Sequence, residues 1–227
     1  MSLDLYIGNK NYSSWSLRPW LLLKHLGIPF TEHMVSVAGR DYNPALRPIA
    51  GNARVPCLHV DGFQIWESLA IAEYLAEQYP ALWPADPKAR ARARSISAEM
   101  HAGFANLRKA MPMNLKFRLR GKPADAAVQR DIDRIVELWT EARTRFATPD
   151  GPYLFGDFSV ADGMYAGCLA LPYLQRAAAA RGGGLPGYAA GPPRHAGMVR
   201  GGASGNRSAC ALRRSGRGVR RGSLECY

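Results

Sequence analysis

The stretch that decides the fold is "RVPCLHVDGFQIWESLAIAEYL", residues 54–75. Residues 54–60 and 63–66 read as two strands, and the Asp61-Gly62 pair between them is the strongest short hairpin signal. Residues 67–80 then read as a helix, for which Ser68 is a natural N-cap and Pro80 the stop. The stretch therefore predicts a hairpin that leads directly into a helix.

The residues before this stretch add a strand, a helix and a second strand. Residues 3–8 predict the first strand, and residues 16–27 predict a helix that Gly27 closes as its C-terminal cap. Residues 29–37 alternate like a further strand. The order strand, helix, strand, loop, strand, strand, helix is that of an α/β thioredoxin-like domain, which we expect over residues 1–79.

The remaining periodic segments are helical. Residues 80–87 are a Pro-rich linker, and an all-α C-terminal domain is expected over residues 88–171. Residues 88–111 predict one long helix, in which the "ARARAR" repeat is a solvated face. Residues 124–146 predict another helix with apolar side chains at a spacing of three to four, namely Val128, Ile132, Ile135 and Leu138. Ser159 and Asp162 stand at capping-box spacing at the start of a further helix.

The basic charge belongs to the C-terminal part of the sequence. Residues 168–227 hold ten arginines and one acid, and so carry +9 of the formal net charge of +12. Residues 172–227 are rich in Gly and Arg, lack a helical or strand period, and predict an irregular, disordered or aberrant tail. The alternative is an RNA-binding tail. We favour the first interpretation because aromatic residues are nearly absent there, so nucleic acid is not an expected partner.

Composition also excludes several classes of protein. The four cysteines (Cys57, Cys168, Cys210 and Cys226) show neither close pairing nor zinc-like spacing, so no metal site is expected. No apolar run is long enough to span a bilayer, and residues 1–8 lack the pattern of a signal peptide. The expectation is a cytoplasmic protein without a membrane partner.

Four short motifs carry a family resemblance when taken in order. They are "SSWS" at residues 13–16, "RVP" at 54–56, Asp61-Gly62, and "ES" at 67–68, with "SLAIAEYL" and "SVAD" behind them. Over roughly residues 1–167 the chain resembles the glutathione transferase family, in particular its serine-type, zeta-like and related bacterial members. The resemblance implies the glutathione transferase fold, glutathione as co-substrate, a small electrophilic substrate, a homodimer and a role in detoxification.

The resemblance also implies which residues bind glutathione. Ser68 would donate to the γ-glutamyl carboxylate and Glu67 would accept from the ammonium group, although Ser68 can equally be a plain N-cap. Val55-Pro56 resembles the cis-proline turn of this fold and would pair with the cysteinyl backbone. Arg54 lies near the peptide or is an exposed charge at a strand edge.

The resemblance implies that the serines supply the catalytic step. A free thiol with a pKa near ~8.5 is mostly protonated at neutral pH, and a hydroxyl that donates to the sulfur favours the reactive thiolate. Ser13 aligns with the reactive position, with Ser14 as the alternative, and Ser14 or Ser16 is expected to cap the helix. No His/Asp partner lies nearby in the sequence, which argues against a serine hydrolase.

The second substrate is expected between the serines and the long helix. The predicted pocket residues are Tyr12, Trp15, Met100, Phe104 and Met111, of which Met100, Phe104 and Met111 can alternatively be core. Trp15 stands where the zeta pattern has cysteine. Three functions remain open: a transferase, a glutathione-dependent cis-trans isomerase similar to maleylacetoacetate isomerase, and a non-catalytic transferase-like binding module.

Overall fold

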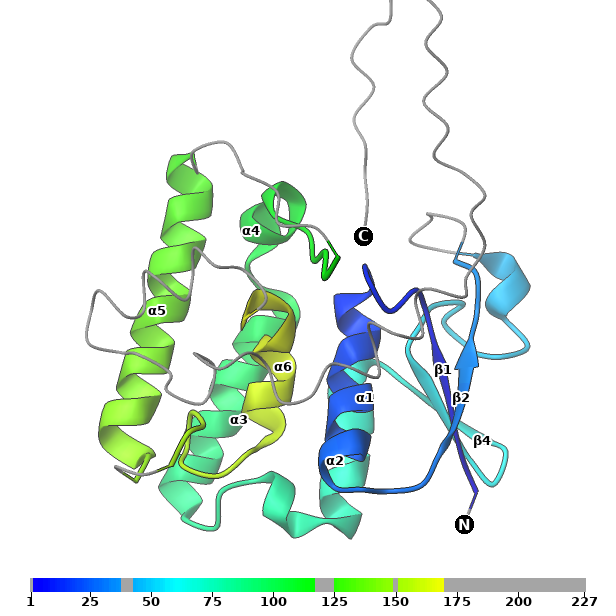
Figure 1. The fold of residues 1–227 in the computed structure, drawn as a ribbon, viewed down its shortest axis with the longest axis horizontal. Coiled ribbons are helices and arrows are strands. Elements are labelled where there is room, and N and C mark those ends of the chain that lie inside the picture. The colour runs from blue at the N-terminus through cyan, green and yellow to red at the C-terminus, as the bar shows by residue number, and fades with distance from the viewer. Residues whose placement is uncertain (1, 38–42, 117–124, 149–150, 170–227) are drawn as a thin grey trace, which may run out of the picture.

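The computed structural model describes residues 2–37, 43–116, 125–148 and 151–169. Its N-terminal part is a small mixed sheet with two helices on one side (Figure 1). The elements are β1 (Leu3–Ile7), α1 (Ser14–His25), β2 (Thr31–Met34), the 3-10 helix η1 (Pro44–Leu46), β3 (Cys57–Val60), β4 (Phe63–Trp66) and α2 (Ser68–Gln78). The predicted element order is confirmed. Strand β1 lies between β2, to which it is parallel, and β3, to which it is antiparallel; β4 is the outer strand beyond β3.

Two turns have the geometry that the sequence predicts. Asp61 and Gly62 have φ values of 47° and 86°, and a two-residue hairpin turn of this kind requires positive φ at both positions. Gly27 has a φ of 66° and its N–H donates to the carbonyl of Lys24 at 3.3 Å, so it ends α1 as expected. Both turns depend on neighbouring residues alone, which is why the sequence reveals them.

The second part of the structure is helical. Its elements are the 3-10 helix η2 (Pro80–Leu82), α3 (Pro87–Ala102), α4 (Ala105–Ala110), α5 (Ala126–Phe146) and α6 (Val160–Leu169). The prediction of one helix over residues 88–111 is wrong, because the chain turns at Gly103 and Phe104, whose φ is 62°. A carboxylate oxygen of Asp131 in α5 accepts from the backbone N–H of Leu107 at 2.9 Å. This contact satisfies one free donor in the first turn of α4 and supports the break.

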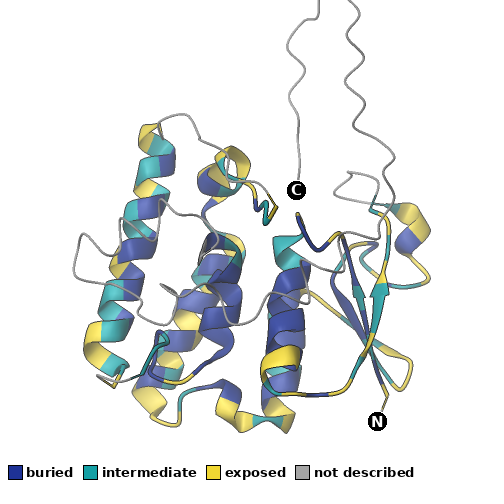
Figure 2. Cartoon of the chain, in the orientation of Figure 1, coloured by how far each residue is buried: buried dark blue, intermediate teal, exposed yellow. Residues whose placement is uncertain are grey.

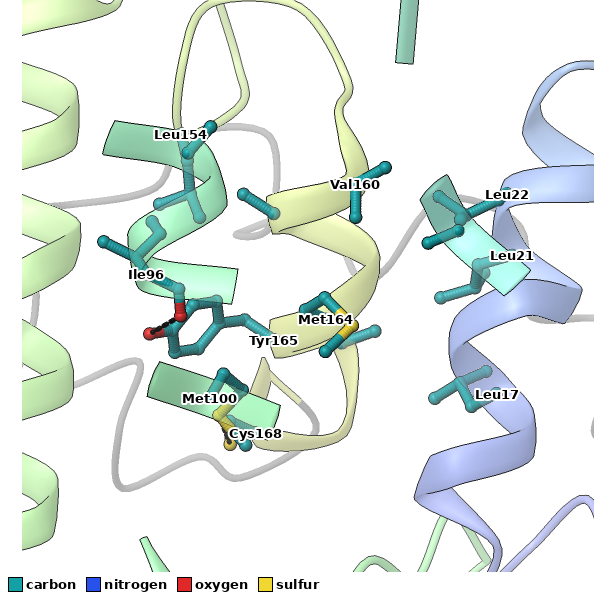
Figure 3. Close-up of a cluster of buried hydrophobic side chains, with 14 of the residues drawn as sticks. Leu17, Leu21, Leu22, Ile96, Met100, Leu154, Val160, Met164, Tyr165 and Cys168 are labelled. Atoms are coloured by element: carbon teal, nitrogen blue, oxygen red, sulfur yellow. Dashed lines mark hydrogen bonds between the residues drawn. The ribbon is translucent and has the colours of Figure 1, made fainter. Parts of the chain in front are cut away.

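The hydrophobic core is continuous from helices α1 and α2, which pack on the sheet, into the helical part of the structure (Figure 2). The four periodic positions predicted in α5 are all buried. Helix α6 lies between α1 and α3, and the Tyr165 hydroxyl donates to the carbonyl of Ile96 at 3.1 Å (Figure 3). A Cβ at Gly167 would come within 2.9 Å of the Ser14 Cβ, so α6 packs closely against the start of α1. This packing brings helical residues next to the serine segment.

The structure also bears on the predictions about the surface. Arg94 of the "ARARAR" repeat is exposed and pairs with Glu73 at 3.2 Å, but Ala89 and Ala93 of the same repeat are buried, so only its arginine side is solvated. Within the described residues, no group of side chains is arranged to hold a metal ion, and no helix has the length and apolar character needed to cross a bilayer. Cys57 and Cys168 are free and buried. The predicted tail, residues 172–227, lies outside the described part of the chain.

Candidate functional site

The serine segment forms a turn that opens helix α1. Ser13 is the N-cap: its Oγ accepts from the backbone N–H of Ser16 at 3.3 Å, and the Ser13 and Ser16 hydroxyl oxygens lie 2.8 Å apart. The buried Ser16 Oγ also accepts from the Gly8 N–H at 3.1 Å. The expectation that Ser14 or Ser16 caps the helix is therefore corrected. Ser14 is the first helical residue, and Ser16 ties the helix to strand β1.

Gly8 brings Ser13 and Val55 to the same place. A Cβ at Gly8 would meet the Ser13 Cβ and the Val55 Cγ2, each at 3.3 Å. A side chain at residue 8 would therefore have to displace Ser13 or Val55 by a few tenths of an ångström. The Val55–Pro56 peptide bond is cis, as the resemblance implies. Arg54 is exposed, and its backbone N–H donates to the Asn52 side chain at 3.1 Å.

The start of helix α2 differs from the prediction. Glu67, with a φ of 70°, is the N-cap without a side-chain capping bond, and Ser68 is the first helical residue. The cap assignment for Ser68 is wrong because its buried hydroxyl instead accepts from Nη1 of Arg18 at 3.2 Å. Glu67 remains half exposed, with its Oε1 3.3 Å from the Asn52 amide and its Oε2 3.5 Å from His101 Nε2. A carboxylate, a hydroxyl and a helix N-terminus thus meet at one point.

A cationic cluster surrounds Trp15. The guanidinium carbons of Arg18 and Arg108 lie 4.2 and 4.6 Å from the centre of its ring, and the His101 ring meets it edge-on at 5.3 Å. Burial, and after it the charge of Arg108, lower the pKa of Arg18 to about 9. Burial, with the charges of Arg18 and Arg108, also lowers the pKa of His101. Trp15 therefore joins α1 to α4 through the Arg108 guanidinium and to α3 through the His101 ring.

The predicted pocket residues divide into two groups. Met100 is buried in the core with its Sδ 3.9 Å from the Cys168 Sγ, and Phe104 is buried as well. The core interpretation fits these two better than the pocket interpretation, since their side chains pack between helices. Tyr12 is 53% exposed, while Trp15 and Met111 are partly buried. These three are the predicted pocket residues that reach the surface.

Sequence reasoning missed two contributors to this region. The side chain of Asn11 donates to Asn114 Oδ1 at 3.0 Å and accepts from the Lys116 N–H at 2.8 Å, which holds the serine segment against the segment after α4. Arg18 is the second. Its sequence signals are its place at the end of the serine pattern "SSWSLR" and its charge within the mostly apolar run "SLRPWLLL".

Asp162 lies in a structural position, as its capping-box spacing predicts, and so does Tyr6. Asp162 is fully buried and accepts from the N–H groups of Ser159 and Leu154 at 2.9 and 3.0 Å. Burial raises its pKa to about 6. Tyr6 stacks on the ring of His33 at 4.5 Å, within the sheet.

Comparison with known proteins places the sequence and the fold among glutathione transferases. A family model described as "Glutathione S-transferase, N-terminal domain" matches residues 12–78. A glutathione transferase homolog from Burkholderia, solved with bound glutathione, has the same fold, with a TM-score of 0.63 over 89% of this chain and 99% of that one at 24% identity. The fold is therefore that of a glutathione transferase.

Two curated relatives extend this result to the sequence. A probable maleylacetoacetate isomerase of Caenorhabditis elegans is 34% identical over 155 residues, which cover 67% of this chain and 70% of that protein. A maleylacetoacetate isomerase of Pseudomonas aeruginosa is 35% identical over 117 residues, and there the match spans 55% of the relative's length. The chain belongs to the glutathione transferase family.

Proposed function

We propose that this protein is a glutathione transferase in which the Ser13 hydroxyl activates the glutathione thiol for attack on an electrophile. The observation that carries the proposal is the position of Ser13. Its hydroxyl caps α1. The Ser13 and Val55 side chains both lie next to Gly8. A thiol held by Val55 would therefore meet both the hydroxyl and the positive end of the helix dipole.

Binding would use the second group of residues. The carboxylate of the γ-glutamyl group fits the N-terminus of α2, where backbone N–H groups and the Ser68 hydroxyl are available as donors. The half-exposed Glu67 carboxylate would accept from the ammonium group. The Val55 backbone would pair with the cysteinyl unit, in the manner of an added strand.

The chemical step needs a donor but no general base on the serine. Ser13 donates to the sulfur, the thiol proton leaves to water, and the thiolate then forms a carbon–sulfur bond as the leaving group departs. A pKa depression of roughly two units corresponds to about 3 kcal/mol. Either hydroxyl of the Ser13–Ser16 pair can supply the proton between them. When Ser16 donates to Ser13, the Ser13 proton is free for the sulfur.

Ser14 is the alternative donor, and the second substrate would lie beyond the serines. Tyr12, Trp15 and Met111 are the partly or largely exposed side chains that would contact it.

The proposal also includes a homodimer and a cytoplasmic location. It divides the chain at residues 80–87 into a glutathione-binding domain (1–79) and a helical domain (88–171).

The names of the curated relatives favour a second candidate, a glutathione-dependent cis-trans isomerase. In that reaction the same thiolate adds to a carbon–carbon double bond. Rotation about the resulting single bond and elimination of the thiolate then regenerate glutathione. Trp15 is the feature that separates this chain from the zeta pattern, and its ring would narrow the space next to the sulfur.

Retention on glutathione-agarose, followed by two assays, tests the proposal. We expect retention and conjugation of a chlorinated aromatic substrate. Turnover of maleylacetone in place of the chlorinated aromatic would establish the isomerase, and binding without either activity would establish a non-catalytic module. A full-length, folded chain that does not bind glutathione would contradict all three.

A further inference from the structure

We propose that Arg18 is a positioning residue of the glutathione site, which acts through Ser68 on the γ-glutamyl carboxylate. The inference rests on the proposed function. Arg18 lies in α1 and is 3% exposed, and its Nη1 reaches across to Ser68 at the start of α2. The side chain therefore joins the helix that carries the thiol-activating serine to the helix that would hold the ligand's carboxylate.

The first argument concerns the direction of the Ser68 hydroxyl. A serine oxygen can accept and also donate one proton. The arginine N–H is only a donor, so the contact of 3.2 Å uses an acceptor position of the Ser68 oxygen. Within the described residues, the structure shows no acceptor for the Ser68 proton. Arg18 thus holds the oxygen in place and leaves its proton available for an anion at the helix N-terminus.

The second argument concerns charge. A buried guanidinium is stable only with hydrogen bonds and a counter-charge. The neighbouring carboxylate of Glu67 pairs instead with Asn52 and His101, and Arg108 adds a second positive charge beside the same indole. In the described part of the chain, no carboxylate hydrogen-bonds to Arg18. Burial and the charge of Arg108 lower the pKa of Arg18 more than the charge of Glu67 raises it, so a ligand carboxylate at Ser68 would add a negative charge that Glu67 alone does not supply.

A purely structural role is the competing explanation, because Arg18 also stacks on Trp15. Arg108 provides the matched control, since it stacks on the same ring but has no contact with Ser68. Loss of cation–π packing would affect both arginines alike. A positioning role predicts that only Arg18 changes the affinity for glutathione.

The experiment measures the dissociation constant of glutathione by calorimetry for the wild type, Arg18→Lys, Arg18→Gln, Ser68→Ala and Arg108→Lys. We expect Arg18→Gln to bind at least tenfold more weakly, with turnover at saturating glutathione within about twofold of the wild type. Arg108→Lys should bind within about twofold of the wild type. In a double-mutant cycle, Arg18→Gln should add little to Ser68→Ala, because Arg18 acts through Ser68.

The truncated ligand cysteinylglycine, which lacks the γ-glutamyl group, gives a second readout. Its weaker binding should be the same in the wild type and in Arg18→Gln. Unchanged glutathione affinity in Arg18→Gln, or additive effects with Ser68→Ala, would overturn the role of Arg18 and leave the proposed function intact. A wild type that does not bind glutathione would overturn both.

Nuclear magnetic resonance of the wild type covers the case in which both Arg18 variants fail to fold. The side-chain N–H resonances of Arg18 should shift when glutathione binds and stay in place with cysteinylglycine. Arg18 resonances that do not respond to saturating glutathione would overturn the inference.

Discussion

The hydroxyl oxygens of Ser13 and Ser16 lie 2.8 Å apart, and the Ser13 oxygen also accepts the backbone N–H of Ser16. One residue thus caps the helix and presents a hydroxyl at its positive end. Capping and thiol activation are compatible at Ser13 when Ser16 donates to it, because the Ser13 oxygen then accepts from the helix and its own proton is free for a ligand.

Replacement of Ser16 by alanine tests this pair of hydroxyls. Ser16→Ala leaves the buried Gly8 N–H without its partner, so we expect a loss of about 1–3 kcal/mol in the free energy of unfolding. The pKa of the thiol of bound glutathione should also rise in Ser16→Ala, but by less than in Ser13→Ala. Chemical denaturation measures the first effect, and Ser95→Ala, at an exposed serine of α3, is the control with a change within about 0.5 kcal/mol. Wild-type stability in Ser16→Ala would contradict the structural role.

The carboxylate of Glu67 gives a prediction on binding. Glu67→Gln keeps the shape of the side chain but removes the charge that would face the ammonium group, so glutathione should bind about tenfold to a hundredfold more weakly. Calorimetry measures the change. Glu77→Gln, at an exposed position of the same helix, should leave the affinity unaltered. Equal affinities of the two variants would remove Glu67 from the site.

The break between α3 and α4 gives a prediction on stability. A Cβ at Gly103 would lie 2.8 Å from the carbonyl oxygen of Glu99, so Gly103→Ala should destabilise the protein by roughly 1–3 kcal/mol. In an uninterrupted helix the same change would be stabilising by up to about 1 kcal/mol. The sign of the change in unfolding free energy decides between a broken and a continuous helix. Ala98→Gly, at an exposed position of α3, measures the effect of the Gly/Ala difference within a continuous helix.

The raised pKa of Asp162 predicts a pH dependence. The folded state binds this proton with a pKa of about 6, against 3.8 for the free side chain, so the folded state holds more protons between these values. The contribution of Asp162 to stability should therefore increase as the pH falls from about 6 to about 4, by up to roughly 3 kcal/mol. Above pH 7 it should be constant.

The unfolding free energies of the wild type and Asp162→Asn, compared at pH 7 and pH 4, measure this contribution. The difference between the two proteins should change with pH, because asparagine does not titrate. Asp125→Asn, at the N-cap of α5, controls for loss of a capping carboxylate. The same difference at both pH values would show that Asp162 does not titrate as stated.

The sequence predicts those parts of the molecule that depend on local chemistry. Asp61-Gly62 and Gly27 adopt the positive φ values that their turns require, and the apolar period of α5 matches its buried face. These features need no knowledge of distant contacts. For the same reason the element order and the family resemblance can be obtained from the chain alone.

The parts that could not be predicted depend on tertiary contacts. Phe104 takes a left-handed conformation where Asp131 of α5 supports the start of α4, and no local signal marks that contact. Glu67, with its positive φ, is the N-cap in place of Ser68, and the Ser68 hydroxyl accepts a hydrogen bond from Arg18 of another helix. Likewise, only packing reveals that Met100 is a core residue.

The central claim is that the Ser13 hydroxyl stabilises the glutathione thiolate. The most direct test is a titration of the ultraviolet thiolate absorbance of glutathione bound to the wild type, Ser13→Ala and Ser14→Ala. The account predicts a wild-type thiol pKa about two units below the free value of ~8.5, and a return close to that value in Ser13→Ala alone. A depressed thiol pKa that persists in Ser13→Ala would contradict it, and loss of the depression only in Ser14→Ala would assign the role to Ser14.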